Sequence, residues 1–131
     1  MKDYIMYGLS GLALATGTYV PMFMALSLIH SFGEKIDSQS KLEKLTKEEF
    51  ENSNKADLSI IPKYGAKRNE SDFVDGNYHL FVGKGNLATR AWVRHEACHI
   101  RNEDLKHHST LRYFLLEEPR ALLYGAFKIK V

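Results

Sequence analysis

The sequence predicts an α+β protein in which an N-terminal apolar helix precedes a small domain with a short mixed or antiparallel sheet and two further helices. Three observations lead to this prediction. Residues 4–33 contain no Asp, Glu, Lys or Arg. Residues 58–83 hold short β-branched or alternating apolar runs separated by turn residues, as strands do. Beyond residue 87 the apolar residues recur at helical spacing.

Residues 1–33 are expected to form a single-pass transmembrane anchor. About 20 apolar residues span a bilayer as a helix, and the uncharged run is longer than that. Tyr4 and Phe32 stand near its ends, where interfacial aromatic side chains are common. Gly11 and Ala15 form a small-residue pair through which the helix can associate with a second copy. A cleaved signal peptide is the alternative, and the flanking charges leave the side of the membrane open.

Residues 34–56 are rich in Lys and Glu and predict a charged linker with one or two short surface helices. Thr46 and Glu49 fit a capping box, in which Thr46 is the N-cap of a helix. The remaining residues, 57–131, are expected to form the folded domain. The part of the chain after the apolar run, residues 34–131, is long enough for one modest core.

Two strands are expected at the start of this domain. Residues 58–61 form a β-branched run that ends at Pro62, and residues 63–72 have the composition of a polar loop. The clearest strand covers residues 77–83, and its side chains alternate between two faces. Tyr78, Leu80 and Val82 share one face, and His79 and Phe81 share the other.

A helix is expected over residues 87–102, with Asn86 as its N-cap and Trp92 packed in the core. A second helix is expected after Pro119, because proline fits the first turn of a helix. The single cysteine, Cys98, rules out a disulfide within the chain. The net charge of +2 arises from interspersed charges of both signs, which gives no indication of a nucleic-acid partner.

The first of these helices carries the motif His95-Glu96-x-x-His99, which many zinc metallopeptidases share. Residues four apart lie on the same face of a helix, so both imidazoles can point at one ion. Catalytic Zn²⁺ takes three protein ligands, keeps one position for water and lowers the pKa of that water. Glu96 would act as general base on this water during hydrolysis of a peptide bond. The motif thus predicts a metallopeptidase with a peptide or protein substrate.

The third ligand distinguishes the classes of such enzymes. The metzincin pattern requires Gly and His at the positions that Asn102 and Leu105 occupy here, so the sequence excludes the metzincin class. Glu117 and Glu118 follow on the next expected helix, and Glu118 begins a Glu-x-x-Ala motif. With this second motif the chain resembles the gluzincins and their smallest members, the minigluzincins.

This resemblance implies a zincin-like domain in which Glu118 is the third zinc ligand and Glu117 is the alternative candidate. It also implies that the strand before the motif helix binds the substrate in extended form along its edge. The strand at that place comprises Tyr78, His79, Leu80, Phe81 and Val82. Leu122 departs from the family pattern, because Asp or Asn often stands there and orients a ligand histidine.

Other interpretations of the site stay open at this point. SprT-like proteins use a further histidine as third ligand, a place that His108 can take. His107 or His108 can also close the site as a fourth ligand, which would make it a structural or vestigial site in a non-catalytic membrane protein. Tyr113, Tyr124 and His108 are candidates for stabilising an oxyanion. Residues 126–131 are a candidate for a segment that blocks the cleft.

Overall fold

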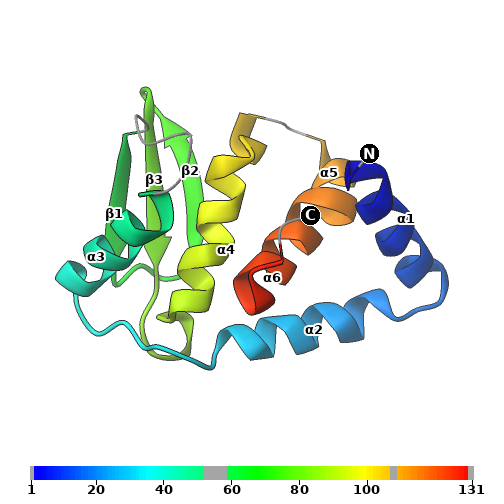
Figure 1. Ribbon diagram of the computed structural model, residues 1–131, viewed down its shortest axis with the longest axis horizontal. Helices are drawn as coiled ribbons and strands as arrows, with labels where there is room; N and C mark the ends of the chain where they lie inside the picture. The colour runs from blue at the N-terminus through cyan, green and yellow to red at the C-terminus, as the bar shows by residue number, and fades with distance from the viewer. Residues whose placement is uncertain (1, 52–58, 107–108, 130–131) are drawn as a thin grey trace.

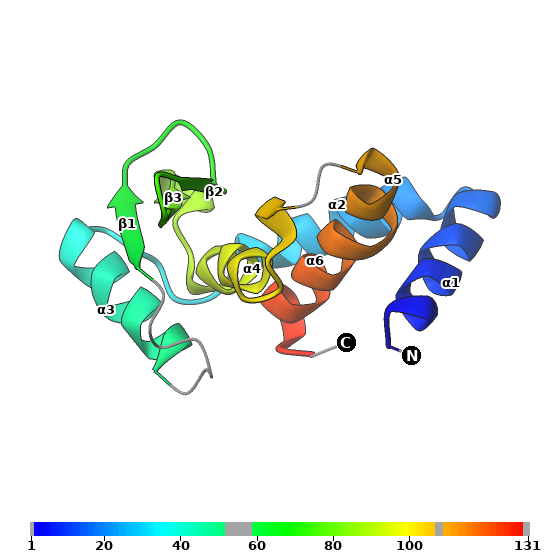
Figure 2. The same ribbon diagram turned by 90° about the horizontal axis from the view of Figure 1, so that it is seen from above.

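The computed structural model describes residues 2–51, 59–106 and 109–129, and it confirms the α+β class. Figure 1 shows a small sheet on one side of α4, with α6, α2 and α1 on the other side; Figure 2 shows the same layers from above. The elements are α1 (Lys2–Ala15), α2 (Tyr19–His30), α3 (Gln39–Phe50), β1 (Ile60–Tyr64), β2 (Glu70–Val74), β3 (Asn77–Val82), α4 (Arg90–Arg101), α5 (Thr110–Arg112) and α6 (Glu118–Phe127). A π-helical turn, Tyr113–Glu117, joins α5 to α6.

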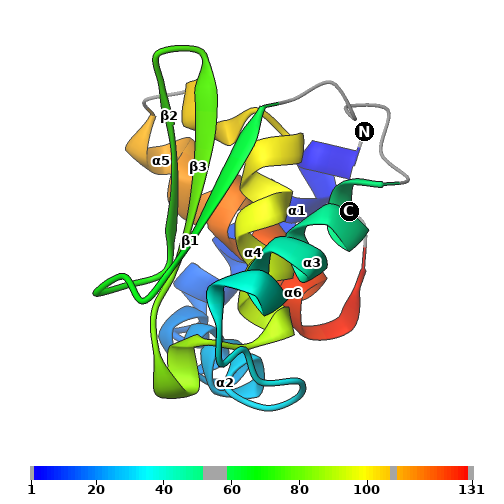
Figure 3. The same ribbon diagram turned by 90° about the vertical axis from the view of Figure 1, so that its left-hand side faces the viewer.

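The sheet is mixed and has three strands in the order β1-β3-β2. β3 pairs in parallel with β1 and antiparallel with β2. Tyr78, Leu80 and Val82 are buried while the residues between them are half-buried, so the predicted alternation is confirmed. These three side chains belong to the main core, which α4 covers (Figure 3).

β2 covers residues for which we expected a loop. Its sequence begins with Glu70, Ser71 and Asp72, so its local composition carries no strand signal. A two-residue turn at Asp75 and Gly76 joins it to β3, and both residues have positive φ angles, 53° and 79°. Turns of this kind match the twist of paired strands, so pairing with β3 imposes the strand. β1 runs through Pro62 instead of ending there, which an edge strand tolerates.

The expected linker is part of the domain. Ile36 and the apolar residues of α3 are buried in the same core as β3 and α4; they are Leu42, Leu45 and Phe50. The side chain of Ser38, not that of Thr46, caps the helix, because its hydroxyl accepts the Lys41 N–H at 3.3 Å. Thr46 lies within α3 and donates to the Leu42 carbonyl at 2.8 Å. Residues 52–56 of the predicted linker lie outside the described residues.

The motif helix is shorter than expected and begins elsewhere. α4 starts at Arg90, because the Thr89 hydroxyl accepts the Trp92 N–H at 3.4 Å. Asn86 lies in a separate 3₁₀ turn, Gly85–Leu87. The chain leaves α4 at Glu103, whose φ of 56° is left-handed and ends the helix.

The prediction of one continuous N-terminal helix is wrong, because the segment forms α1 and α2 at an angle of 115°. Gly17 adopts a φ of 74° at the break, and the Thr16 hydroxyl donates to the Leu12 carbonyl at 2.9 Å. Within the described part of the chain, no single helix is long and apolar enough to cross a membrane; the bent pair together satisfies length and composition. α2 packs on α6, and α1 packs on the π-helical turn.

Candidate metal centre

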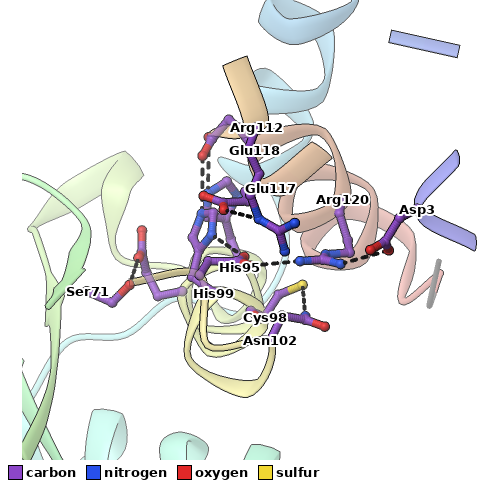
Figure 4. A network of polar contacts seen from close by, with 12 residues as sticks. Asp3, Ser71, His95, Cys98, His99, Asn102, Arg112, Glu117, Glu118 and Arg120 are labelled. Atoms are coloured by element: carbon purple, nitrogen blue, oxygen red, sulfur yellow. Dashed lines mark hydrogen bonds and ion pairs between the residues drawn. The ribbon is translucent and has the colours of Figure 1, made fainter. Parts of the chain in front are cut away.

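α4 and the start of α6 bring His95, His99 and Glu118 together, and all three are buried (Figure 4). One ligand atom from each lies within 4.8 Å of the other two. His95 Nε2 is 3.2 Å from Glu118 Oε1, and His99 Nε2 is 3.1 Å from Glu118 Oε2. Two imidazole nitrogens and a carboxylate of separate residues thus face one point, as a catalytic metal ion requires.

The π-helical turn decides which glutamate reaches this point. Such turns are rare and are frequently found at functional sites. Glu118 follows the turn and its carboxylate contacts His95 and His99 of α4, whereas the carboxylate of Glu117 accepts a hydrogen bond from Arg112 Nε at 2.8 Å (Figure 4). Among the described residues the cluster therefore contains Glu118 and leaves out the reserve candidate Glu117.

The charges of the cluster stabilise one another. Burial alone would raise the pKa of Glu118, but its bonds to His95 and His99 outweigh burial and hold the pKa well below its ordinary value. Burial alone would lower the pKa of His99, but its bonds to Asp104 and Glu118 raise that pKa to about 10. His99 is therefore an imidazolium at neutral pH in this arrangement.

Asp104 orients His99, a role that sequence reasoning missed. Its Oδ2 lies 3.1 Å from His99 Nδ1, and its Oδ1 accepts a hydrogen bond from Arg120 Nη2 at 2.7 Å. Arg120 Nη1 also donates to Asp3 Oδ1 of α1 at 3.5 Å. An acidic residue on the second ring nitrogen fixes the orientation of a ligand histidine. Asp104 follows the motif in a 3₁₀ turn, Asp104–Lys106.

Glu96 is buried beside the three clustered residues but is not one of them. Its Oε2 accepts a hydrogen bond from the Ser71 hydroxyl of β2 at 2.8 Å. A cavity of about 600 Å³ lies next to this carboxylate. Most residues around it come from β2, α4, the π-helical turn and α6, and Asn69 directly precedes β2. They include Asn69, Ser71, Trp92, Glu96, Tyr113 and Glu118.

The prediction that the substrate pairs with a free edge of the strand before the motif helix is wrong. Tyr78, His79, Leu80, Phe81 and Val82 form β3, the middle strand, which pairs with β1 and β2 along its length. Its backbone groups are therefore not free to pair with a peptide. β2 is the edge strand that borders the cavity, through Glu70 and Ser71.

Of the predicted oxyanion donors, Tyr113 lines the cavity, and its ring stacks on His99 at a centroid distance of 6.4 Å. Burial and the neighbouring Glu118 raise the pKa of Tyr113 above its ordinary value, so its hydroxyl keeps its proton. Tyr124 lies elsewhere and its hydroxyl donates to Glu49 at 3.3 Å. His107 and His108, the other candidate ligands, lie outside the described residues.

Cys98 is a buried thiol outside the metal cluster, as predicted from its position on the helix. Burial raises the pKa of this thiol to about 11.

Residues 126–129 do not border the cavity, so the described part of the expected blocking segment leaves the cleft open. Residues 130 and 131 lie outside the described residues.

Comparisons with protein-family models, with curated proteins and with solved structures find no match to this chain.

Proposed function

We propose that the chain is a zinc-dependent metallopeptidase of the gluzincin type. The observation that carries this proposal is the buried convergence of His95, His99 and Glu118. Two imidazoles and one carboxylate are a known ligand set of catalytic zinc. Asp104 supplies the outer contact that such histidines need, and the cavity leaves one side of the cluster open to a substrate.

Zn²⁺ in this site would polarise the scissile carbonyl and make a water molecule acidic near neutral pH. Glu96 would take the proton from that water and pass it to the departing amine. The Ser71 hydroxyl donates to one oxygen of this carboxylate, and Glu96 borders the cavity. The protonated Tyr113 hydroxyl is the donor best placed to stabilise the negative charge that develops on the carbonyl oxygen.

We propose that the substrate binds in extended form along β2. The free edge of β2 offers backbone groups that can pair with a peptide, and this kind of binding accepts varied sequences. Glu70 and Ser71 of this edge border the same cavity as Glu96. The edge therefore leads a bound peptide past the general base.

Hydrolysis of a mixed peptide library by the purified full-length chain tests this function. We expect cleavage in the presence of zinc, loss of cleavage with a chelator and recovery when zinc is restored. Mass spectrometry of the products identifies the cleaved bonds. Absence of cleavage by the chain with zinc bound would contradict the proposal.

Zinc binding is expected to release a proton from His99. Its pKa of about 10 means that His99 is protonated at pH 8, whereas a metal ligand must be neutral. Zinc affinity should therefore rise with pH up to about 10. Calorimetric titration at pH 8 in two buffers of different ionisation enthalpy measures this release, and Asp104→Asn should reduce it. Equal binding enthalpies in the two buffers would contradict the assignment.

We further propose that α1 and α2 attach the chain to a membrane. Many of their large apolar side chains are exposed, among them Leu12 at 63 % and Leu28 at 61 %. Residues 4–33 carry no Asp, Glu, Lys or Arg, so little opposes their contact with lipid. Self-association through Gly11 and Ala15 is a second use of the same segment.

The double substitution Leu12→Asp and Leu28→Asp should weaken this attachment by several-fold or more, because it puts charge on the apolar surface. Flotation of the full-length chain with lipid vesicles measures the effect. Val74→Asp changes an exposed apolar residue of β2 and is the control that should still float. Wild-type protein that stays with the unbound fraction would contradict the proposal.

A further inference from the structure

His30, the last residue of α2, is fully buried beside the metal centre although it belongs to the apolar N-terminal segment. Its ring centroid lies 4.5 Å from that of Trp92 and 5.3 Å from that of His95. A buried imidazole is costly unless both of its nitrogens have hydrogen-bond partners. Nδ1 has one, because it lies 2.6 Å from the Leu26 carbonyl. Nε2 has no partner among the described residues.

The partner of Nδ1 determines what Nε2 can do. A carbonyl oxygen only accepts hydrogen bonds, so Nδ1 of His30 carries the proton and donates it to Leu26. In the neutral ring Nε2 then has a free lone pair and acts as an acceptor. His30 Nε2 is thus an unused acceptor, buried where α2 meets α4 and α6.

His95 has the complementary requirement. Its Nε2 points at Glu118, and its Nδ1 is also buried without a partner among the described residues. A neutral histidine that binds a metal through Nε2 carries its proton on Nδ1, and this N–H needs an acceptor. For His99 this acceptor is the carboxylate of Asp104. Leu122 stands where the gluzincin pattern often has an acid or amide, and its apolar side chain cannot accept the His95 proton.

The placement of the two rings suits a hydrogen bond between them. Two imidazoles joined by an N–H···N bond have centroids about 5 Å apart, because the nitrogens are about 3 Å apart and each lies just over 1 Å from its ring centre. The centroids of His30 and His95 are 5.3 Å apart, with 77° between the ring planes. The two nitrogens are unpaired in this structure, so the bond requires a ring to turn from its present orientation.

We infer that His30 is a positioning residue for the metal centre, whose Nε2 accepts the Nδ1 proton of His95 and holds that imidazole toward the ion. The inference rests on the proposed function, because metal binding places the proton on Nδ1. The end of α2 is then part of the site as well as of the apolar N-terminal segment.

Two neighbours hold His30 in this place. The Thr89 hydroxyl at the start of α4 donates to its backbone carbonyl. On α6, Gly125 leaves the space that the ring needs, since a Cβ at this position would collide with His30 Nε2. Any larger residue at Gly125 would therefore displace the acceptor from His95.

Trp92 is a competing donor for the same lone pair, because its indole N–H is also buried without a partner among the described residues. Trp92→Phe removes this N–H and keeps an aromatic ring beside the two histidines. If His30 serves His95, this variant should keep the zinc affinity of the wild type. A loss equal to that of the His30 variant would assign the acceptor to Trp92 and overturn the inference.

The first experiment compares zinc affinity, by competition with a chelator, in His30→Leu and His30→Gln. Leucine removes the acceptor at similar volume, and glutamine can place an amide oxygen near the position of Nε2. We expect His30→Leu to bind zinc ~10–100-fold more weakly, as when other outer contacts of a ligand histidine are lost. His30→Gln should recover most of this loss. Equal affinity of His30→Leu and wild type would overturn the inference.

The second experiment needs no variant. In the full-length, zinc-loaded chain with ¹⁵N label, NMR should show a protected Nδ1 proton on His95 and a scalar coupling from that nitrogen to His30 Nε2. A rapidly exchanging proton without this coupling would overturn the inference even where His30→Leu fails to fold. Failure of the proposed function is a separate result, because the wild-type chain would then take up no zinc or would bind zinc and cleave no peptide.

Discussion

Glu96→Gln should leave zinc binding intact and reduce peptide hydrolysis by about 10²–10⁴-fold, the usual contribution of general acid–base catalysis. Glutamine has nearly the same shape and its carbonyl oxygen can still accept the hydrogen bond from Ser71. It has no basic carboxylate to take a proton from water. Steady-state hydrolysis of one defined peptide, with metal analysis of each sample, measures both quantities.

Ser71→Ala is the matched control for this substitution. It removes the hydrogen bond to Glu96 Oε2 and keeps the base, so the loss of activity should be much smaller. Unchanged hydrolysis by Glu96→Gln would remove Glu96 from its role. Loss of zinc from Glu96→Gln would instead place this carboxylate among the ligands.

Glu118→Gln should lose zinc, with an affinity more than about 100-fold below that of the wild type. Loss of an outer contact costs ~10–100-fold, and loss of a charged ligand should exceed that. The carboxylate of Glu118 contacts both His95 and His99, so its removal affects the whole cluster. Chelator competition measures the affinity, and circular dichroism shows whether the variant is folded.

The adjacent position offers a matched control in Glu117→Gln. Glu117 is equally buried but contacts Arg112 at 2.8 Å, a hydrogen bond that glutamine can still accept. This variant should keep zinc and most of the activity. Loss of zinc from Glu117→Gln with zinc retained by Glu118→Gln would reverse the assignment of the two glutamates.

The parts of the site that depend on local spacing were predictable from the sequence. His95 and His99 lie on one face of α4 because they are four residues apart, which any helix here would ensure. Glu118 was predicted as the third ligand from the resemblance to the gluzincins, whose Glu-x-x-Ala motif it begins, and it starts α6. The alternation in β3 was equally local.

The remaining contacts come from segments that are far apart in sequence. Ser71 reaches Glu96 only because β3 imposes a strand on polar residues, a pairing that local composition does not predict. Asp104 and Arg120 meet through the packing of α6 against the end of α4. The position of His30 depends on the bend at residues 16–18, which returns α2 to the domain.

The organisation of the chain was predicted least well, for a related reason. The hydropathy pattern led us to predict an apolar anchor and a charged linker outside the folded domain. Mean hydropathy averages over a segment and does not show which of its side chains are buried. α3 has few apolar residues, yet Leu42, Leu45 and Phe50 suffice to bury one face. Composition alone does not show that such a helix belongs to the core.

The central claim is that zinc is held by three protein ligands with one position open to water, and the structure of the zinc-loaded chain tests it most directly. We predict one ion bound by His95 Nε2, His99 Nε2 and the carboxylate of Glu118, with water as the remaining ligand and Glu96 beside that water. A fourth protein side chain on the ion, such as His107 or His108, would contradict the claim and indicate a structural site.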